Sequence, residues 1–250
     1  MPIELRIFAV PNLPEVDPGA DLGALLADAL GRPDVALDNG DIVVVAQKIV
    51  SKAEGAVVDL SHVKPSALAA SWAVTYGKDP AAVEVVLRES RRIVRMDRGI
   101  IISETRHGFV CANAGVDASN VPPGFVTVLP RDPDGSAAKL RAAICARLRK
   151  NVGVIVADTF GRPWREGVVN VAIGVAGLRP LDDWRGRTDT FGRGLHATVI
   201  AVADELASAA ALVMGKASRI PAAVVRGAAE CCGEGSADLL VRTPATDMFR

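Results

Sequence analysis

The sequence has few of the residues that most often carry metal clusters, disulfides or nucleophilic catalysis. Its 250 residues include three histidines and four cysteines. No pair of cysteines has C-x-x-C spacing, which argues against a zinc site and a disulfide framework. A chain without disulfides is expected in a reducing cytoplasm. The cysteines are Cys111, Cys145, Cys231 and Cys232.

The chain also lacks an excess of charge of either sign and a long uncharged apolar run. Lys and Arg together number 29, as do Asp and Glu, so the composition does not indicate a nucleic-acid groove. The longest apolar tract, Ala197–Val213, contains Asp204 and Glu205 and is too polar to span a bilayer. The N-terminal sequence does not resemble a signal peptide. We expect neither a nucleic acid nor a membrane as partner.

The common nucleotide-binding motifs are absent as well. Gly215-Lys216-Ala217-Ser218 imitates the end of a P-loop, but the first glycine position is Ala210 and the hydroxyl position is Ala217. The piece Gly192-Arg193-Gly194 follows no predicted strand and has no third glycine at the dinucleotide spacing. Any nucleotide must therefore be held by an unusual set of residues.

Short strands and helices follow one another irregularly, which favours an α+β fold with mixed, largely antiparallel sheets and flanking helices. We interpret residues 1–250 as one ligand-binding or catalytic domain, which could consist of two interleaved subdomains. The predicted strands are Ile3–Val10, Ile42–Val50, Ala56–Leu60, Gly99–Ser103, Phe109–Ala112, Phe125–Leu129, Val152–Ala157, Val168–Ala176 and Ala222–Val225. The predicted helices are Leu22–Leu30, Pro65–Tyr76, Ala81–Arg91 (with Pro80 in its first turn), Gly135–Arg149 and Leu195–Gly215.

The segment after Val152–Ala157 has the composition of a metal and phosphate site. Asp158 and Thr159 would stand at the end of a buried strand and offer the oxygen ligands that a hard divalent cation requires. Arg162 and Arg165 follow, and guanidinium groups hold phosphate oxygens well. The alternative is that Asp158 caps a turn and the arginines are solvated.

A second carboxylate, Asp117, strengthens the metal interpretation. It lies in the sequence NAGVDASN, and Asp117 and Asn120 would share a face if a helical turn begins there. Asn120 could equally be a turn or capping residue. Asp117, Asp158 and Thr159 together would give Mg²⁺ two carboxylates and a hydroxyl. The sequence alone does not show that the two segments meet.

Five blocks in this order resemble the coenzyme F420-0:L-glutamate ligase family, the GTP-dependent γ-glutamyl ligases that build the tail of coenzyme F420. The resemblance extends over nearly the whole chain and is greatest to the N-terminal ligase domain of the actinobacterial two-domain enzymes. The blocks are Leu13-Pro14-Glu15, QKIVSKAEG (Gln47–Gly55), NAGVDASN (Asn113–Asn120), DTFGRPWREG (Asp158–Gly167) and VMGKASRIPAAVVRG (Val213–Gly227).

The resemblance implies a nucleotide site, a metal site and a mechanism. It implies a GTP-dependent ligase that adds L-glutamate to coenzyme F420-0 through an acyl phosphate, with Mg²⁺ or Mn²⁺ on Asp117, Asp158 and Thr159 and K⁺ as a further candidate. Charge for phosphoryl transfer would come from Lys52, Arg162 and Arg165. The implied nucleotide contacts are Leu13, Pro14, Glu15, Val16, Gln47, Lys48, Lys52, Asn120, Met214, Gly215, Lys216, Ala217, Ser218, Arg219, Ile220 and Pro221.

One position departs from the family pattern. Relatives often carry Glu or Gln after the Met-Gly pair, as a further metal ligand, where this chain has Lys216. A protonated lysine does not coordinate a cation, so either the site has fewer protein ligands or Lys216 supplies one positive charge by touching phosphate. Glu54 is a weaker candidate that could pair with Lys52 or reach a metal. Trp164 could stack on the deazaflavin, or serve in the core or a lid.

The resemblance also implies an intertwined homodimer in the cytoplasm. Residues 246–250 resemble the junction to an FMN-dependent, nitroreductase-like domain, so such a partner domain would belong to a longer form of the protein. Two other functions stay open: a metal-dependent phosphotransferase acting on a small carboxylate, and a ligand-binding module without catalysis.

Overall fold

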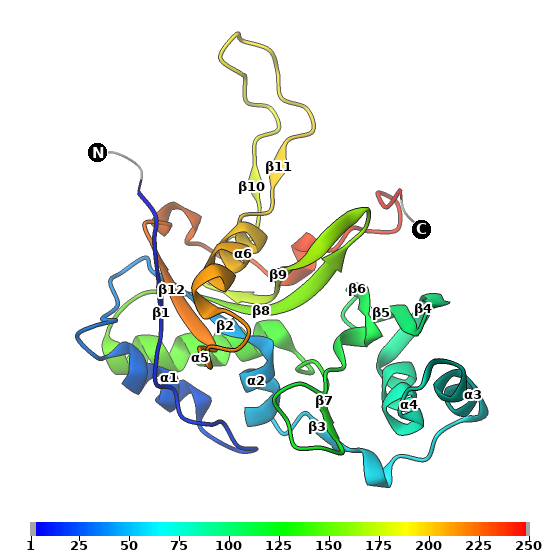
Figure 1. Ribbon diagram of the computed structural model, residues 1–250. Helices are drawn as coiled ribbons and strands as arrows, with labels where there is room; N and C mark the ends of the chain where they lie inside the picture. The colour runs from blue at the N-terminus through cyan, green and yellow to red at the C-terminus, as the bar shows by residue number, and fades with distance from the viewer. Residues whose placement is uncertain (1–3, 249–250) are drawn as a thin grey trace.

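A five-stranded sheet forms the centre of the molecule (Figure 1). The computed structural model describes residues 4–248, so Ile3 of the predicted first strand lies outside the described residues. The third and fourth strands of this sheet run parallel and all other neighbours are antiparallel, which confirms the predicted α+β fold with mixed, mostly antiparallel sheets. In spatial order the strands are β1 (Arg6–Ala9), β12 (Ala222–Arg226), β2 (Ile42–Ala46), β8 (Gly153–Arg162) and β9 (Arg165–Ala176).

Helices cover both faces of the central sheet. Two helices, α1 (Leu22–Leu30) and α5 (Pro133–Leu148), lie on one face, and α6 (Val202–Met214) lies on the other (Figure 1). Val43 and Val45 of β2 pack on the side of α1 and α5, whereas Ile42 and Val44 pack on the side of α6. Successive strand residues point to opposite faces, so an uninterrupted apolar strand is buried on both sides.

A second unit stands beside the sheet. It consists of α3 (Ala67–Tyr76), α4 (Pro80–Glu89) and a three-stranded antiparallel sheet, β4 (Ser90–Asp97), β5 (Ile100–Thr105) and β6 (Val110–Ala112). This unit has its own apolar cluster. Pro80 occupies the first turn of α4 as predicted, behind the N-cap Asp79.

The remaining elements are short. The strands β3 (Val57–Asp59) and β7 (Phe125–Thr127) pair with each other, and α2 (Gln47–Ala53) follows β2 directly. The 3₁₀ helices are η1 (Leu60–His62), η2 (Asn113–Gly115), η3 (Ala229–Cys231) and η4 (Ala237–Leu240). No helix within residues 4–248 is long and apolar enough to cross a membrane.

An arm projects from the body between β9 and α6. It begins and ends with the paired strands β10 (Asp182–Asp183) and β11 (Val199–Ile200), and Figure 1 shows it standing clear of the sheet. The predicted helix Leu195–Gly215 is wrong for its first seven residues, because Leu195 and Thr198 accept backbone hydrogen bonds from the opposite side of the arm. The helix proper begins at Val202.

The structure corrects the predicted elements at three further points. The strand predicted over Ile42–Val50 ends at Ala46, and α2 begins at Gln47. The strand predicted over Val152–Ala157 continues as far as Arg162, since Thr159 and Asn170 remain paired in a long β8–β9 hairpin. The strand β4 was not predicted; its sequence SRRIVRMD has no strict alternation, and two irregularities interrupt its pairing with β5.

Candidate functional site

The predicted site residues gather at one edge of the central sheet. Ala46 and Ala157 are the last paired residues of the parallel strands β2 and β8. Gln47 therefore starts α2 at the point where Asp158 follows the last residue of β8 that pairs with β2. The carboxyl ends of neighbouring parallel strands are a frequent place for ligand binding, because loops and helix starts meet there.

The antiparallel neighbours bring two more blocks to the same edge. The backbone N–H of Ala46 donates to the carbonyl oxygen of Pro221 at 2.8 Å, so residues 214–221 reach the edge before β12 begins. The N–H of Val10 donates to the carbonyl of Ala222 at 2.9 Å, and the segment with Leu13–Val16 leaves from there. Four blocks far apart in sequence thus meet at one sheet edge.

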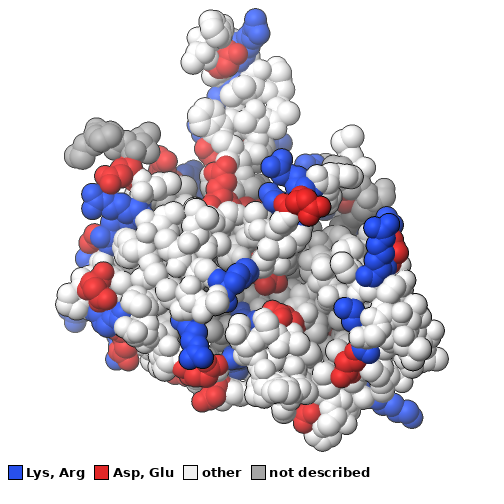
Figure 2. Space-filling view, viewed as in Figure 1, with Lys and Arg blue, Asp and Glu red and all other residues white. Residues whose placement is uncertain are grey.

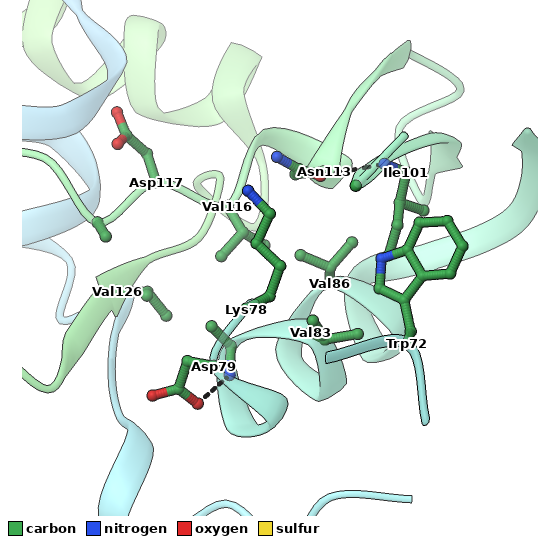
Figure 3. Close-up of a pocket in the computed structure, with 13 residues that line it drawn as sticks. Trp72, Lys78, Asp79, Val83, Val86, Ile101, Asn113, Val116, Asp117 and Val126 are labelled. Atoms are coloured by element: carbon green, nitrogen blue, oxygen red, sulfur yellow. Dashed lines mark hydrogen bonds between the residues drawn. The ribbon is translucent and has the colours of Figure 1, made fainter. Parts of the chain in front are cut away.

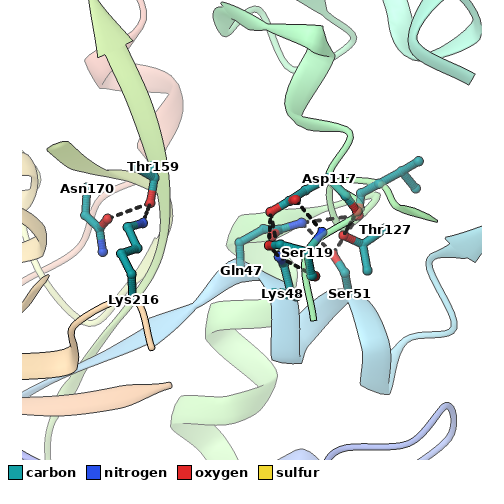
Figure 4. A network of polar contacts seen from close by, with 10 residues as sticks. Gln47, Lys48, Ser51, Asp117, Ser119, Thr127, Thr159, Asn170 and Lys216 are labelled. Atoms are coloured by element: carbon teal, nitrogen blue, oxygen red, sulfur yellow. Dashed lines mark hydrogen bonds and ion pairs between the residues drawn. The ribbon is translucent and has the colours of Figure 1, made fainter. Parts of the chain in front are cut away.

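Lys48 ties the Asp117 segment to this edge (Figure 4). Its ammonium Nζ lies 2.5 Å from Asp117 Oδ2 and 2.7 Å from the carbonyl oxygen of Ser119, and it also contacts the Ser119 hydroxyl. Although burial acts to raise it, the hydrogen bonds from Lys48 and Ser119 hold the pKa of Asp117 below its ordinary value. Asp117 and Thr127 exchange backbone hydrogen bonds, so Asp117 is extended and no helical turn begins there.

A second lysine lies at Thr159. Lys216 Nζ donates to Thr159 Oγ1, and that hydroxyl donates to Asn170 Oδ1 at 2.8 Å (Figure 4). The prediction missed Asn170, although a single amide within the apolar run of β9 was a signal that could have been used. Gly215, with φ of 61°, turns the chain between α6 and Lys216, and a Cβ there would stand 2.6 Å from Ser218 Oγ.

Charged groups of both networks influence the pKa of Asp158. Its pKa is raised to about 6, mainly by burial and also by the charge of Asp117, although the backbone hydrogen bond from Thr159 and the charges of Lys216 and Lys48 act in the opposite direction. The structure therefore brings the two predicted carboxylates within reach of each other's charge, which sequence alone did not show. Within residues 4–248 no group of three or more His, Cys, Asp or Glu side chains is arranged to hold a metal ion.

Lys52 and Glu15 form an ion pair that joins α2 to the N-terminal segment. The Lys52 side chain is only 12% exposed, whereas that of Glu15 is 78% exposed. Both Lys48 and Lys52 thus lie on α2 and form ion pairs. Glu54, the weaker candidate, instead accepts a hydrogen bond from Ser136 of α5.

The two arginines of the β8–β9 hairpin lie at its tip, away from Asp158. Arg162 and Arg165 face each other at the tip of β8 and β9, with Trp164 in the turn between them. Four residues of extended strand separate Arg162 from Asp158, about 13 Å. Trp164 is 82% exposed, so a role in the core is excluded. Asn120 is exposed with φ of 56°, next to the Ser119 that Lys48 contacts.

The face of the molecule shown in Figure 2 has no single dominant charge. Figure 2 shows basic and acidic side chains scattered over this face, with acidic atoms in the recess between the central sheet and the unit of α3 and α4. This agrees with the balanced composition and limits any phosphate-binding charge to local clusters.

Most of the chain matches one known protein family. The family model described as F420-0:Gamma-glutamyl ligase matches residues 11–227. The chain is similar to the coenzyme F420:L-glutamate ligase of Methanothermobacter thermautotrophicus, at 47% identity over 98% of this chain and 99% of the relative. The proteins of the same name from Methanopyrus kandleri (48%; 98% of both chains) and Archaeoglobus fulgidus (42%; 99% of this chain and 97% of the relative) are similar over the same extent.

Proposed function

The chain belongs to the F420-0:gamma-glutamyl ligase family, and we propose that it joins L-glutamate to coenzyme F420-0 with GTP and a divalent metal. The observation that carries this proposal is the convergence of residues 13–16, 47–52, 117–120, 158–159 and 214–221 around the ends of β2 and β8. These are the segments that the family resemblance assigns to nucleotide and metal.

The proposed reaction has two balanced steps. A terminal carboxylate oxygen of F420-0 attacks the γ-phosphorus of GTP, and the bond from that phosphorus to the bridging oxygen breaks, releasing GDP. The glutamate amine then attacks the acyl carbon of the acyl phosphate, phosphate leaves with the attacking oxygen, and the amine loses a proton. Such a transfer needs alignment and positive charge more than a protein nucleophile.

Three ammonium groups are available for that charge. Lys48, Lys52 and Lys216 come from two separate segments at the sheet edge, and each contacts an oxygen of the protein: Asp117, Glu15 and Thr159 respectively. We infer that these contacts hold the lysines in position and that phosphate oxygens attract them when GTP binds. The segment 13–16 and the residues after α6 would form the remaining walls of the nucleotide site.

Asp117, Asp158 and Thr159 fit a divalent metal. Their donors are hard oxygens, and the burial that raises the pKa of Asp158, together with the charge of Asp117, disfavours the free carboxylate, a cost that a bound cation would offset. When bound, Mg²⁺ or Mn²⁺ would neutralise charge that develops on the phosphoryl oxygens. We propose one such ion held by these three side chains, with K⁺ as an additional cofactor candidate.

The arm and the hairpin support a homodimer. Phe191 is 86% exposed on an arm that stands clear of the body, and Trp164 at the hairpin tip is also exposed; an aromatic side chain on such a projecting segment is placed to meet a second chain. We propose that a second copy covers them and that Arg162 and Arg165 contribute charge near that contact. An FMN-dependent, nitroreductase-like partner domain and the cytoplasm as location stay predictions.

The test is to incubate the protein with F420-0, L-glutamate, GTP and Mg²⁺ or Mn²⁺ and to follow product mass. We expect a gain of one glutamyl unit that depends on both GTP and metal. GTP consumption that yields a phosphorylated acceptor in the presence of glutamate, without an amide product, would identify a phosphotransferase instead. Binding of GTP and F420-0 without turnover of either would identify a ligand-binding module.

A further inference from the structure

A pocket of about 300 Å³ lies next to the sheet-edge site and is not used by the nucleotide or metal residues, apart from one shared side chain. It is lined by residues of α3, α4, β5, the segment 113–118 and β7 (Figure 3). No family motif from the sequence falls on α3 or α4, so sequence analysis gave no sign of it.

The walls of this pocket are mainly apolar. Val83 and Val86 of α4 form one side, and Val116 and Val126 form another, with the indole of Trp72 at one end (Figure 3). Trp72 is fixed by Tyr76, one helical turn later, with ring centroids 4.2 Å apart. Pockets with apolar walls, an aromatic ring and a few polar groups are typical of sites for planar organic ligands.

Two hydrogen-bond donors stand among these apolar walls. The ammonium of Lys78 makes no ion pair within the described part of the chain, and Figure 3 shows it between Trp72 and Asp117. Asn113 Oδ1 accepts the N–H of Ile101 at 3.3 Å, which leaves the amide nitrogen of Asn113 on the side that faces Lys78 (Figure 3). An ammonium and an amide N–H₂ bind carbonyl oxygens.

Asp117 connects the pocket to the reaction site. It lies at the end of the pocket opposite Trp72 in Figure 3, and the same carboxylate contacts Lys48 at the sheet edge. A ligand that fills the pocket therefore ends at the proposed metal and phosphate groups. This geometry suits a molecule with a large planar body and a reactive tail.

We propose that this pocket binds the deazaflavin ring of F420-0, with the ring against Trp72, its carbonyl oxygens on Lys78 and Asn113, and its tail directed past Asp117. The assignment rests on the proposed ligase function and specifies where that site holds its acceptor. L-Glutamate fits the pocket less well, because its short carbon chain would leave Trp72 and the valine and isoleucine side chains of the lining largely uncovered, whereas a planar ring system covers them.

The test fills the pocket without touching the sheet edge. Ala82 lines the pocket on α4 and is half-buried, so Ala82→Phe places a ring in the space that the deazaflavin would take. Ala70→Phe adds the same ring on an exposed position of α3 and is the matched control. Binding is measured directly from the fluorescence anisotropy of F420-0 without GTP, and the KM values for F420-0, GTP and L-glutamate are measured separately.

We expect Ala82→Phe to weaken F420-0 binding and raise its KM about tenfold or more, a loss of the size expected for blocking an aromatic contact, with the KM values for GTP and glutamate unchanged. Ala70→Phe should behave as the wild type. Trp72→Ala should weaken F420-0 binding, and Trp72→Phe should restore it.

Two results would overturn the assignment while leaving the ligase function intact: unchanged F420-0 binding in an Ala82→Phe protein with wild-type GTP binding, or a rise in the KM for glutamate in place of that for F420-0. A wild-type protein that neither binds nor extends F420-0 would instead refute the proposed function itself.

Discussion

Lys216, the second residue after α6, donates a hydrogen bond to Thr159, which lies 57 residues earlier in the chain in the middle of β8. The family pattern places an acidic or amide ligand at this position, whereas this chain places an ammonium beside the proposed metal ligands. The charge of Lys216 also lowers the pKa of the neighbouring Asp158. We infer that Lys216 supplies a fixed positive charge at a point where a further metal ligand would otherwise stand.

Lys216→Met removes this charge and keeps most of the side-chain length. We expect kcat to fall about 100-fold, the usual loss for one group that stabilises developing negative charge, with little change in the KM for F420-0. Lys139 is an exposed lysine on α5, so Lys139→Met is the control for the loss of a lysine. Steady-state kinetics that give the same kcat for both variants would contradict the role given to Lys216.

Asp158→Asn should abolish metal-dependent turnover, with a loss of about 100-fold or more, because it removes a charged ligand and leaves the size of the side chain unchanged. Mn²⁺ binding, followed by electron paramagnetic resonance, should weaken in parallel. Glu166→Gln, at the hairpin end of β9, is the matched control outside the cluster. Near-normal Mn²⁺ binding and turnover in Asp158→Asn would contradict the metal site.

In metal-free protein, the difference in stability between the wild type and Asp158→Asn should depend on pH. The folded-state pKa of Asp158 is raised from 3.8 to about 6, so the folded protein holds this proton more tightly than the unfolded chain. Wild-type stability relative to Asp158→Asn should therefore fall as the pH rises from about 4 to 6 and stay lower above it. Chemical denaturation at pH 4 and pH 8 measures this. A gap between the two proteins that does not widen with pH would contradict the raised pKa.

Lys52→Met should affect nucleotide binding far more than folding. Its partner Glu15 is 78% exposed, so the ion pair should contribute less than about 1 kcal/mol to the free energy of unfolding. The KM for GTP should rise about tenfold, since a phosphate-binding charge is lost. Titrations with GTP and F420-0 separate the two effects, and an equal loss of both affinities would indicate misfolding instead.

Phe191→Ser should weaken self-association. The wild type should behave in light scattering as a dimer of 26.1 kDa chains, and the variant should dissociate at lower concentrations because an exposed apolar contact is lost. Leu212→Ser changes a side chain on α6 that is comparably exposed and serves as the control. A monomeric wild type would refute the dimer.

The sequence predicted the sheet core well because the signal was local and strong. Val43 to Val45 and Val154 to Val156 are uninterrupted apolar runs, and both are strands buried on two faces. The end of β2 was not predictable in this way, since Lys48 and Val50 fit a strand as well as a helix. Gln47 starts α2 there, and its amide binds Ser51 and the carbonyl of Val128, a contact 81 residues away that no local pattern encodes.

The site was predictable only as separate pieces. The acidic and basic residues of each block were visible, but the pairing of Asp117 with Lys48 depends on how the segment 113–120 packs against α2. Asp158 was expected at a strand end, whereas β8 continues because β9 pairs with it as far as the tip. For the same reason Arg162 and Arg165 lie along the hairpin, away from the carboxylate they were expected to accompany.

An isotope-transfer experiment tests most directly the central claim, that the reaction passes through an acyl phosphate. F420-0 carrying ¹⁸O in both oxygens of its terminal carboxylate is converted with GTP, metal and L-glutamate, and the released phosphate and the amide product are weighed by mass spectrometry. The acyl-phosphate route predicts one ¹⁸O atom in each phosphate and one in the new amide. Unlabelled phosphate alongside a ligated product would contradict it.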